Sequence, residues 1–310
     1  MEYRHVPVLL QETVDGLQVK SDGVYLDGTL GGGGHAEKIL EKLTTGRLIA
    51  NDLDAAAIQN AQERLRPYLD KITFVHDDYK RISDHLDDLG VGELDGILLD
   101  LGVSSYQIDT AERGFSYNKD ARLDMRMDRE QALSAYEVIN TFDEKKLADI
   151  FFTYGEERYA RKIAARIVEK RREAPIETTL ALADLVASCY PAKERHICGN
   201  PAKRTFQAVR VFVNGELDGL YEFLTEIALR LKKGGRMCVI TFHSLEDRIV
   251  KKAFCELEKD CVCDKRRFPV CVCNKRKEAV IITKKPISGK TEDAENKRAE
   301  SAKLRIIERV

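Results

Sequence analysis

One stretch decides the fold of this chain: Asp27-Gly28-Thr29-Leu30-Gly31-Gly32-Gly33-Gly34-His35. It follows an apolar, β-rich run at residues 24–26, and a helical pattern begins directly after it at residue 36. Glycines at such a junction let the backbone turn sharply and approach a ligand closely, because they carry no Cβ atom. A tight turn that binds nothing would use the same residues, so the surroundings of the stretch decide what it holds.

Short β-rich runs alternate with helical patterns along much of the chain, which predicts a parallel sheet with crossover helices. We expect strands at residues 24–26, 47–50, 72–75, 97–99 and 237–242, and helices at residues 36–43, 55–65, 217–231 and 245–257. The last two strands, at residues 279–283 and 303–307, have no convincing helix between them, which predicts a hairpin at the sheet edge. The expected fold class is therefore α/β, mostly parallel with an antiparallel edge strand.

The pattern changes at about residue 109, where the chain becomes helical, heavily charged and interrupted by prolines until about residue 210. We therefore expect an inserted helical domain at residues 109–210, with a role in substrate recognition. The insertion divides the α/β domain into residues 1–108 and 211–310, and the second part carries a Cys- and Lys-rich loop at residues 261–277.

The composition is that of a folded protein, since hydrophobic residues make up 43% and charged residues 33% of the 310. Residues 1–107 hold 10 basic and 19 acidic side chains, whereas residues 211–310 hold 22 and 16. A solvated surface explains this asymmetry as readily as an acidic part for a cationic ligand and a basic part for a polyanion. No apolar stretch approaches the ~20 residues of a membrane span, and the start of the chain lacks a signal-peptide pattern, so we expect a cytoplasmic protein without membrane contact.

Carboxylates follow or end four of the expected strands, where ligands of open α/β sheets bind; they are Asp27, Asp52, Asp77, Asp78 and Asp100. A pyrophosphate would be repelled by so many like charges. S-adenosyl-L-methionine carries a sulfonium, an ammonium and a ribose but no phosphate, so the acids favour it over a nicotinamide dinucleotide, which stays the alternative. Asp52 has a spacing that suits hydrogen bonds to ribose hydroxyls, and Tyr79 either borders the adenine or packs as a partly buried aromatic.

Seven strings in chain order resemble the bacterial RsmH (MraW) family: DGTLGGGGH at 27–35, DGILLDLGVSS at 95–105, ERGFS at 112–116, LDMRM at 123–127, YGEER at 154–158, RTFQAVR at 204–210 and TFHSLEDR at 241–248. The resemblance implies a class I methyltransferase sheet, which is Rossmann-like, with a helical insertion. It also implies a cytoplasmic enzyme that uses S-adenosylmethionine to methylate N4 of a decoding-centre cytidine in 16S ribosomal RNA of the small subunit.

The family's cofactor site carries over by resemblance onto matching positions of this chain. Three residues at the end of the glycine stretch would hold the methionine end of the cofactor, and these are Gly33, Gly34 and His35. Asp52 would bind the ribose and Tyr79 would lie near the adenine, while Asp100 and Gln107 would close the site.

Methylation of cytosine N4 requires an acceptor for the amino hydrogens, because the nitrogen lone pair is delocalised into the ring. The sequence after the fourth strand is Asp100-Leu101-Gly102-Val103-Ser104-Ser105, without the Pro-Pro-aromatic string that many enzymes acting on exocyclic amines place there. Asp100 is the best-placed acceptor, and Ser104 and His243 are the alternatives. RNA phosphates would meet basic residues of the helical insertion, namely Arg161, Lys162, Arg166, Lys203, Arg204 and Arg210, although a merely solvated face explains the helix at residues 161–172 equally well.

Two Cys-x-Cys pairs lie seven residues apart: Cys261 with Cys263, and Cys271 with Cys273. Four thiolates so close in sequence are compatible with a tetrahedral zinc site, although the spacing within each pair is tighter than usual, and reduced thiols in a loop are the alternative. The flanking residues Lys265, Arg266, Arg267, Lys275, Arg276 and Lys277 would present positive charge to RNA in either state.

Two other functions remain open at this point. The chain could methylate another RNA site, because the sheet does not specify the substrate. It could also be a nucleic-acid-binding module that retains an inactive cofactor fold. The sequence makes no prediction of oligomeric state.

Overall fold

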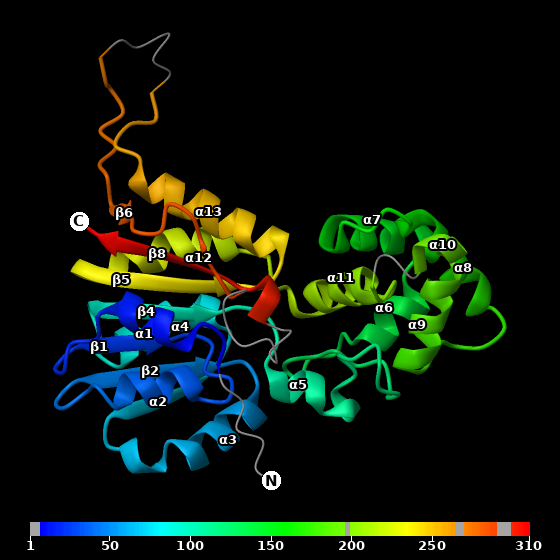
Figure 1. Ribbon diagram of the computed structural model, residues 1–310, viewed down its shortest axis with the longest axis horizontal. Helices are drawn as coiled ribbons and strands as arrows, with labels where there is room; N and C mark the ends of the chain where they lie inside the picture. Colours follow the sequence, from blue (N-terminus) through cyan, green and yellow to red (C-terminus); the bar gives the residue numbers. More distant parts are fainter. Residues whose placement is uncertain (1–6, 196–198, 264–269, 290–298) are drawn as a thin grey trace. The chain divides into compact units, whose positions relative to one another are not determined.

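The computed structural model describes residues 7–195, 199–263, 270–289 and 299–310, and the chain divides into two compact units (Figure 1). Residues up to Gly102 and from Leu217 onward form one unit, which we call the sheet unit. Val103–Glu216 form the other, the helical unit. The helical unit ends beyond residue 210 because its last helix, α11 (Lys203–Asn214), continues to pack apolar side chains such as Val213 into the core of that unit.

The sheet unit is built on one twisted sheet with the strand order β3-β2-β1-β4-β5-β8-β6, and β7 also pairs with β8. The strands are β1 (Val24–Asp27), β2 (Arg47–Asp52), β3 (Ile72–His76), β4 (Leu94–Asp100), β5 (Leu231–Thr241), β6 (Ala279–Ile281), β7 (Ile287–Ser288) and β8 (Lys303–Arg309). The first five in this spatial order pair in parallel, so their carboxyl ends meet at one edge. The expected α/β class is confirmed.

The antiparallel part of the sheet consists of the final strands. β8 pairs antiparallel with β5 on one side and with β6 on the other, with Ile307 opposite both Met237 and Ile281. The expected edge hairpin is therefore present, but its antiparallel strand β8 lies one place inside the edge, and β6 forms the edge itself.

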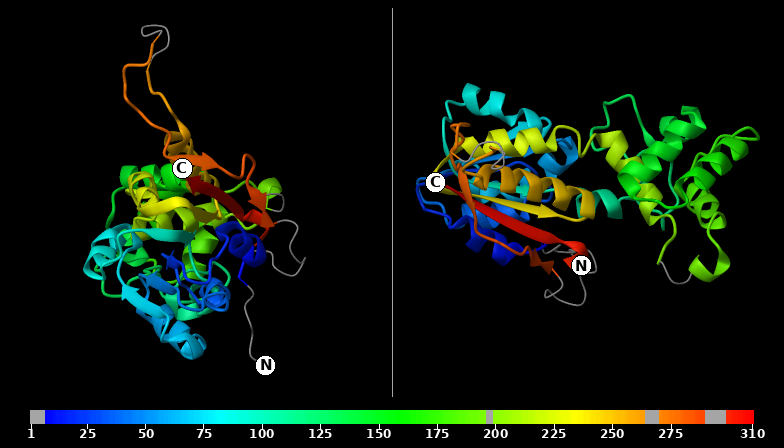
Figure 2. Two further views of the ribbon diagram at one scale, coloured as in Figure 1. Left: turned by 90° about the vertical axis from the view of Figure 1, so that its left-hand side faces the viewer. Right: turned by 90° about the horizontal axis from the view of Figure 1, so that it is seen from above.

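Helices cover both faces of this sheet (Figure 2). One core lies beneath α4 (Ile82–Asp88), α12 (Leu220–Ile227) and α13 (Ser244–Glu258). The opposite core lies beneath α1 (Leu10–Leu17), α2 (Gly34–Leu40) and α3 (Ala55–Arg64). Central strand β4 is buried on both faces, as its unbroken apolar run predicts, and it therefore anchors the two layers of helices to one another.

Strand β5 begins earlier than the sequence pattern indicates. Leu231 already pairs with Leu94, and Arg236 pairs with Gly96, so residues 232–235 form an irregularity within the strand rather than a turn before it. Gly234 accommodates this irregularity with a φ of 76°. Helix α12 ends at Ile227, and the 3-10 helix Ala228–Arg230 leads from it into the strand, so α12 is shorter than the predicted helix at residues 217–231.

The helical unit has its own apolar core, which includes the fully buried Phe151 on α7 and Ile163 on α8. Its helices are α5 (Ser105–Asp109), α6 (Ala135–Thr141), α7 (Glu144–Gly155), α8 (Ala160–Lys170), α9 (Thr179–Ser188), α10 (Ala192–Arg195) and α11. Side-chain caps fix several of their starts, as Ser134 does for α6 and Asp143 for α7. Within the described ranges, neither unit contains a helix with the length and apolar character that crossing a membrane requires.

Candidate cofactor site

The glycine stretch runs across the carboxyl ends of three adjacent strands. The Gly28 N–H donates to Leu98 O on β4 at 2.9 Å, and the Leu30 N–H donates to Asn51 O on β2 at 2.9 Å. The Asn51 side chain then donates from Nδ2 to Gly28 O at 3.2 Å. The turn is therefore held by backbone pairing on both sides, and it places the last residues of β1, β2 and β4 beside one another.

Asp27 ends β1 and is almost fully buried. Its Oδ1 accepts a hydrogen bond from the Thr29 N–H at 3.1 Å, while its Oδ2 is buried without a hydrogen-bond partner in the described part of the chain. Burial raises the pKa of the Asp27 carboxyl to about 7. A buried carboxyl with one free oxygen has the character of a ligand-binding group, because a donor or a cation can satisfy it.

Asp100 ends β4, and its backbone N–H donates to Thr29 Oγ1 at 2.6 Å. Its Oδ1 is also buried without a hydrogen-bond partner among the residues that the structure describes, whereas the side chain as a whole is 26% exposed. Burial raises the pKa of Asp100 well above its usual range, and the negative charges of Asp27 and Glu246 raise it further. Asp27 and Asp100 thus repel each other in the free protein, and a cationic ligand would relieve that repulsion.

Asp52 ends β2, and both of its oxygens accept backbone hydrogen bonds. Oδ2 accepts from the Gly31 N–H at 2.7 Å and Oδ1 from the Asp54 N–H at 2.8 Å. Burial raises the pKa of Asp52 to about 6. Each carboxylate oxygen can accept a second hydrogen bond, so the predicted contact with a ribose is compatible with this role in the turn but stays a prediction.

The four consecutive glycines face different surroundings. Gly33 has a φ of 73°, and a Cβ atom there would lie 3.3 Å from Ala61 and Leu65, while a Cβ on Gly34 would meet Pro7 Cγ at 2.2 Å. Gly32 is exposed, and a Cβ on it would meet nothing within 4 Å. A ligand can therefore approach the turn at Gly32, whereas Gly33 and Gly34 are required by the packing of the turn itself.

The buried His35 opens helix α2, where its Nε2 lies 3.1 Å from Val8 O and its Nδ1 lies 3.7 Å from Asp100 Oδ2. The Tyr79 ring packs edge-on against Phe223 at 5.1 Å between centroids, which fixes the orientation of the ring. Both residues belong to the sheet unit, and their predicted contacts with a cofactor stay predictions.

Two of the carboxylates expected at the strand ends serve local structure. Asp77 contacts His85 Nε2 through Oδ2 at 2.8 Å and accepts from the Asp78 N–H through Oδ1. Asp78 caps the short 3-10 helix Tyr79–Arg81 by accepting from the Lys80 N–H. The acidic edge of the sheet that remains for a ligand therefore consists mainly of Asp27, Asp52 and Asp100.

The remaining predicted site residues belong to capping boxes at the starts of two helices. Gln107 lies in the helical unit, where its Oε1 accepts from the Ser104 N–H at 3.0 Å and its own N–H donates to Ser104 Oγ. His243 caps α13 by accepting from the Glu246 N–H. Gln107 as a cofactor contact, and Ser104 or His243 as acceptors in catalysis, stay predictions.

Three residues support the site and were not singled out from the sequence. Thr29 positions Asp100, Asn51 fixes the glycine turn, and Glu246, which is 1% exposed, accepts from the Phe242 and His243 N–H groups. Glu246 stands three residues after the helix cap His243, and this capping-box spacing is the signal that could have found it.

The basic residues predicted to contact RNA have different surroundings in the helical unit. Arg210 forms a two-fold ion pair with Glu216 at 2.8 Å and is only 15% exposed, and its predicted contact with RNA stays a prediction. Lys162 donates to Cys189 O, Arg166 pairs with Glu169 and Arg204 donates to Glu156 O. Arg161 and Lys203 are exposed on α8 and α11 and are available to a polyanion.

Comparison with known proteins finds a family model and relatives that match the whole length of the chain. A sequence model of the MraW methylase family matches residues 2–310. A relative from Clostridium botulinum (strain Loch Maree / Type A3), named Ribosomal RNA small subunit methyltransferase H, is 53% identical over 312 residues that cover 100% of each chain. A protein of the same name from Lachnospira eligens is 50% identical and covers 100% of this chain and 99% of its own length. Among solved structures, an rRNA methylase from Streptococcus thermophilus aligns with a TM-score of 0.42 and 10% identity over 99% of each chain, which is too weak a likeness to argue from.

We predict that Asp27→Asn stabilises the free protein at pH 8. The pKa of Asp27 is about 7 in the folded state against an ordinary value of 3.8, so between these pH values the folded state binds more protons than the unfolded state. Stability therefore falls as the pH rises toward 7, and an amide avoids this loss. We expect a gain of about 1–3 kcal/mol in the free energy of unfolding at pH 8 and almost none at pH 4. Urea unfolding at both pH values checks this, and equal or lower stability of the variant at pH 8 would contradict it.

We predict that alanine at two adjacent glycines affects different properties, stability at Gly33 and cofactor binding at Gly32. Gly33→Ala forces a side chain into left-handed backbone and costs about 1–2 kcal/mol of stability. Gly32→Ala leaves stability unchanged, because its Cβ meets nothing, but it obstructs a ligand lying on the turn and weakens S-adenosylmethionine binding by about tenfold. Thermal unfolding and calorimetric titration separate the two effects. Unchanged affinity in Gly32→Ala would show that the cofactor does not lie against the turn at Gly32.

Proposed function

The chain belongs to the MraW methylase family, and on this premise we propose that it methylates ribosomal RNA of the small subunit with S-adenosylmethionine as the methyl donor. The acceptor is N4 of a decoding-centre cytidine in 16S ribosomal RNA, as the family resemblance implies. The substrate is either the assembled small ribosomal subunit or free 16S ribosomal RNA, and methyl transfer to each distinguishes them.

The pair of carboxyls beside the glycine turn, of which Asp27 is buried and Asp100 partly buried, is the observation that carries this proposal. Asp27 and Asp100 each keep one buried oxygen without a hydrogen-bond partner within the described ranges, and the charge of Asp27 raises the pKa of Asp100. Isolated buried charges are costly, so such a pair is expected where a cation is bound. The sulfonium and ammonium groups of S-adenosylmethionine supply that charge, whereas a pyrophosphate would be repelled.

The residues of this chain fit the cofactor as follows. Gly33, Gly34 and His35 would hold its methionine end, with Asp27 and Asp100 beside the cationic groups, and the exposed Gly32 leaves room for close approach of the ligand. Asp52 would be the ribose partner, and Tyr79 would border the adenine. When bound, the cofactor supplies a methyl group on a positively charged sulfur, which a nitrogen lone pair can attack.

Asp100 accepts the amino hydrogens of the target base in the proposed mechanism. The N4 lone pair becomes available only when the amino group leaves the plane of the ring, and a carboxylate that accepts its hydrogens favours that geometry. The hydrogen bond from the Asp100 N–H to Thr29 Oγ1 fixes the backbone from which the Asp100 side chain extends. Because burial raises its pKa, Asp100 is a stronger base than an exposed aspartate and holds the departing proton more readily.

The target base must also leave its stack before N4 can reach this edge of the sheet, as in other enzymes that act on bases. Exposed basic residues of the helical unit, such as Arg161 and Lys203, would contact RNA phosphates and hold the strand during this step. Binding should therefore weaken with salt.

Methyl transfer to small ribosomal subunits tests the proposed function. Subunits that lack the modification are incubated with the protein and labelled S-adenosylmethionine, in parallel with free 16S ribosomal RNA, and the labelled nucleotide is mapped by mass spectrometry. We expect label on N4 of one decoding-centre cytidine. Label at another nucleotide would support the alternative of a different RNA site, and RNA binding without any transfer would support an inactive binding module.

We predict that Asp100→Asn lowers kcat/KM for RNA by about 10²-fold or more, because the amide cannot take the proton. The variant should still fold. In the unaltered enzyme, kcat/KM should rise with pH as Asp100 loses its proton, and this rise should be absent from the residual activity of the variant. Asp70→Asn, which changes an exposed carboxylate before β3, is the matched control. Full turnover in Asp100→Asn would exclude Asp100 as the acceptor.

A further inference from the structure

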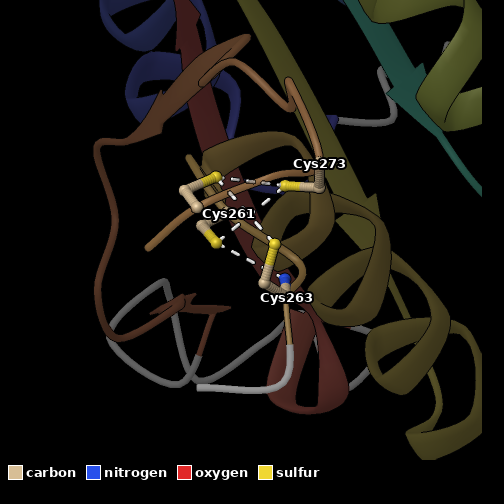
Figure 3. Close-up of side chains that lie close together, drawn as sticks. Cys261, Cys263 and Cys273 are labelled. Atoms are coloured by element: carbon tan, nitrogen blue, oxygen red, sulfur yellow. Dashed lines mark hydrogen bonds between the residues drawn. The ribbon is translucent and has the colours of Figure 1, made fainter. Parts of the chain in front are cut away.

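A cluster of four cysteines lies outside the cofactor site, in the connection between α13 and β6. Two short segments come together there, one with Cys261 and Cys263 and the other with Cys271 and Cys273. Figure 3 shows the sulfur atoms of the labelled residues turned toward one another. Residues 264–269, which include three of the basic residues that the sequence places in this loop, lie outside the described residues.

The distances between the sulfur atoms match a single tetrahedral metal ion. Cys271 Sγ lies 3.5 Å from Cys273 Sγ, Cys273 Sγ lies 3.9 Å from Cys261 Sγ, and Cys263 Sγ lies 4.0 Å from Cys271 Sγ. All four sulfurs lie within 4.8 Å of one another. A zinc–sulfur bond of about 2.3 Å in a tetrahedral site places neighbouring sulfurs about 3.8 Å apart, whereas a disulfide requires about 2.05 Å. The cluster therefore has the dimensions of a metal site and not of a pair of disulfides.

Backbone N–H groups point at the same sulfur atoms. The Val262 N–H donates to Cys273 Sγ at 3.4 Å, and the Val272 N–H donates to Cys263 Sγ at 3.3 Å. The Cys263 N–H donates to Cys261 Sγ at 3.4 Å. Two of these bonds cross between the segments, so each Cys-x-Cys turn supplies donors to the other. Such bonds around a metal site stabilise negative charge on sulfur and orient the ligands.

Apolar burial does not hold the two segments together. The three valines beside the cysteines point to solvent, with Val262 54% exposed, Val270 75% and Val272 62%. Small folded regions without a hydrophobic core are commonly held by disulfides or by a metal ion. The four cysteines are not disulfide-bonded in this structure, so a metal ion is the cross-link of that kind which fits it.

We propose that Cys261, Cys263, Cys271 and Cys273 bind one zinc ion as a closed structural site. Binding forms four zinc–sulfur bonds and releases up to four thiol protons, with no change in oxidation state, and it leaves a net charge of about −2 on the site. All four positions on the metal are filled by protein, so the site has no place for a reactive water. Its role is to fold the connection between α13 and β6 and to hold the basic residues beside it, among them Lys275, in a fixed place.

Metal analysis of the full chain, purified without added metal, tests the proposal. We expect about one zinc per chain, released when a mercurial reagent titrates the thiols. Cys273→Ser should reduce the zinc content to near zero, whereas Cys255→Ser, which removes an exposed cysteine of α13, should leave it unchanged. Circular dichroism checks that both variants are folded.

Cobalt provides a second measurement that does not depend on a variant. After removal of zinc, the unaltered protein should bind one cobalt ion and show the intense visible absorption of tetrahedral cobalt with four thiolates. A metal-free protein in which the four thiols of the cluster react and which binds neither ion would overturn the proposal, as would iron in the purified chain or loss of zinc from Cys255→Ser. None of these readouts involves methyl transfer, so the zinc site and the proposed function stand or fall separately.

Discussion

Repulsion between two carboxyls, the buried Asp27 and the partly buried Asp100, is the constraint on which the proposed cofactor edge of the sheet unit depends. Asp27 and Asp100 stand at the ends of the neighbouring strands β1 and β4, so parallel pairing itself brings their charges together. In the free protein this arrangement is costly, and burial raises the pKa of Asp27 to about 7 and that of Asp100 well above its usual range. A bound cation would neutralise this negative charge, so the free energy of the repulsion would be recovered on binding and would add to the affinity for a cationic ligand.

The rest of the sheet unit keeps that arrangement rigid. Hydrogen bonds from the glycine turn to β2 and β4 fix its path, and Thr29 joins the turn to the backbone of Asp100. The Asp52 carboxylate accepts hydrogen bonds from the Gly31 N–H in the glycine turn and from the Asp54 N–H just after β2. A ligand therefore meets a site whose backbone is already in place, and little ordering remains to oppose binding.

Much of this could be predicted from the sequence, because parallel strands bring their carboxyl ends to one edge and the chain ends its apolar runs on aspartates. The strand-end acids Asp27, Asp52 and Asp100 follow from that rule alone. The pattern could not show that Asp77 and Asp78 serve local turns, because those bonds depend on side-chain geometry within a few residues. The capping box of Ser104 and Gln107, by contrast, has the Ser-x-x-Gln spacing that marks a helix start in a sequence. Likewise β5 contains Gly234 within an irregular pairing, which in sequence is indistinguishable from a turn before a strand.

The position of β8 has a consequence for the order in which the sheet is completed. β8 fills the gap between β5 and β6, yet it is synthesised after both of them. Until it arrives, β5 presents an unpaired edge in the middle of the future sheet, and such edges invite pairing with other chains. A nascent chain is thus most vulnerable to aggregation in this interval, and variants that slow the docking of β8 would reduce the yield of folded protein without any effect on the mature enzyme.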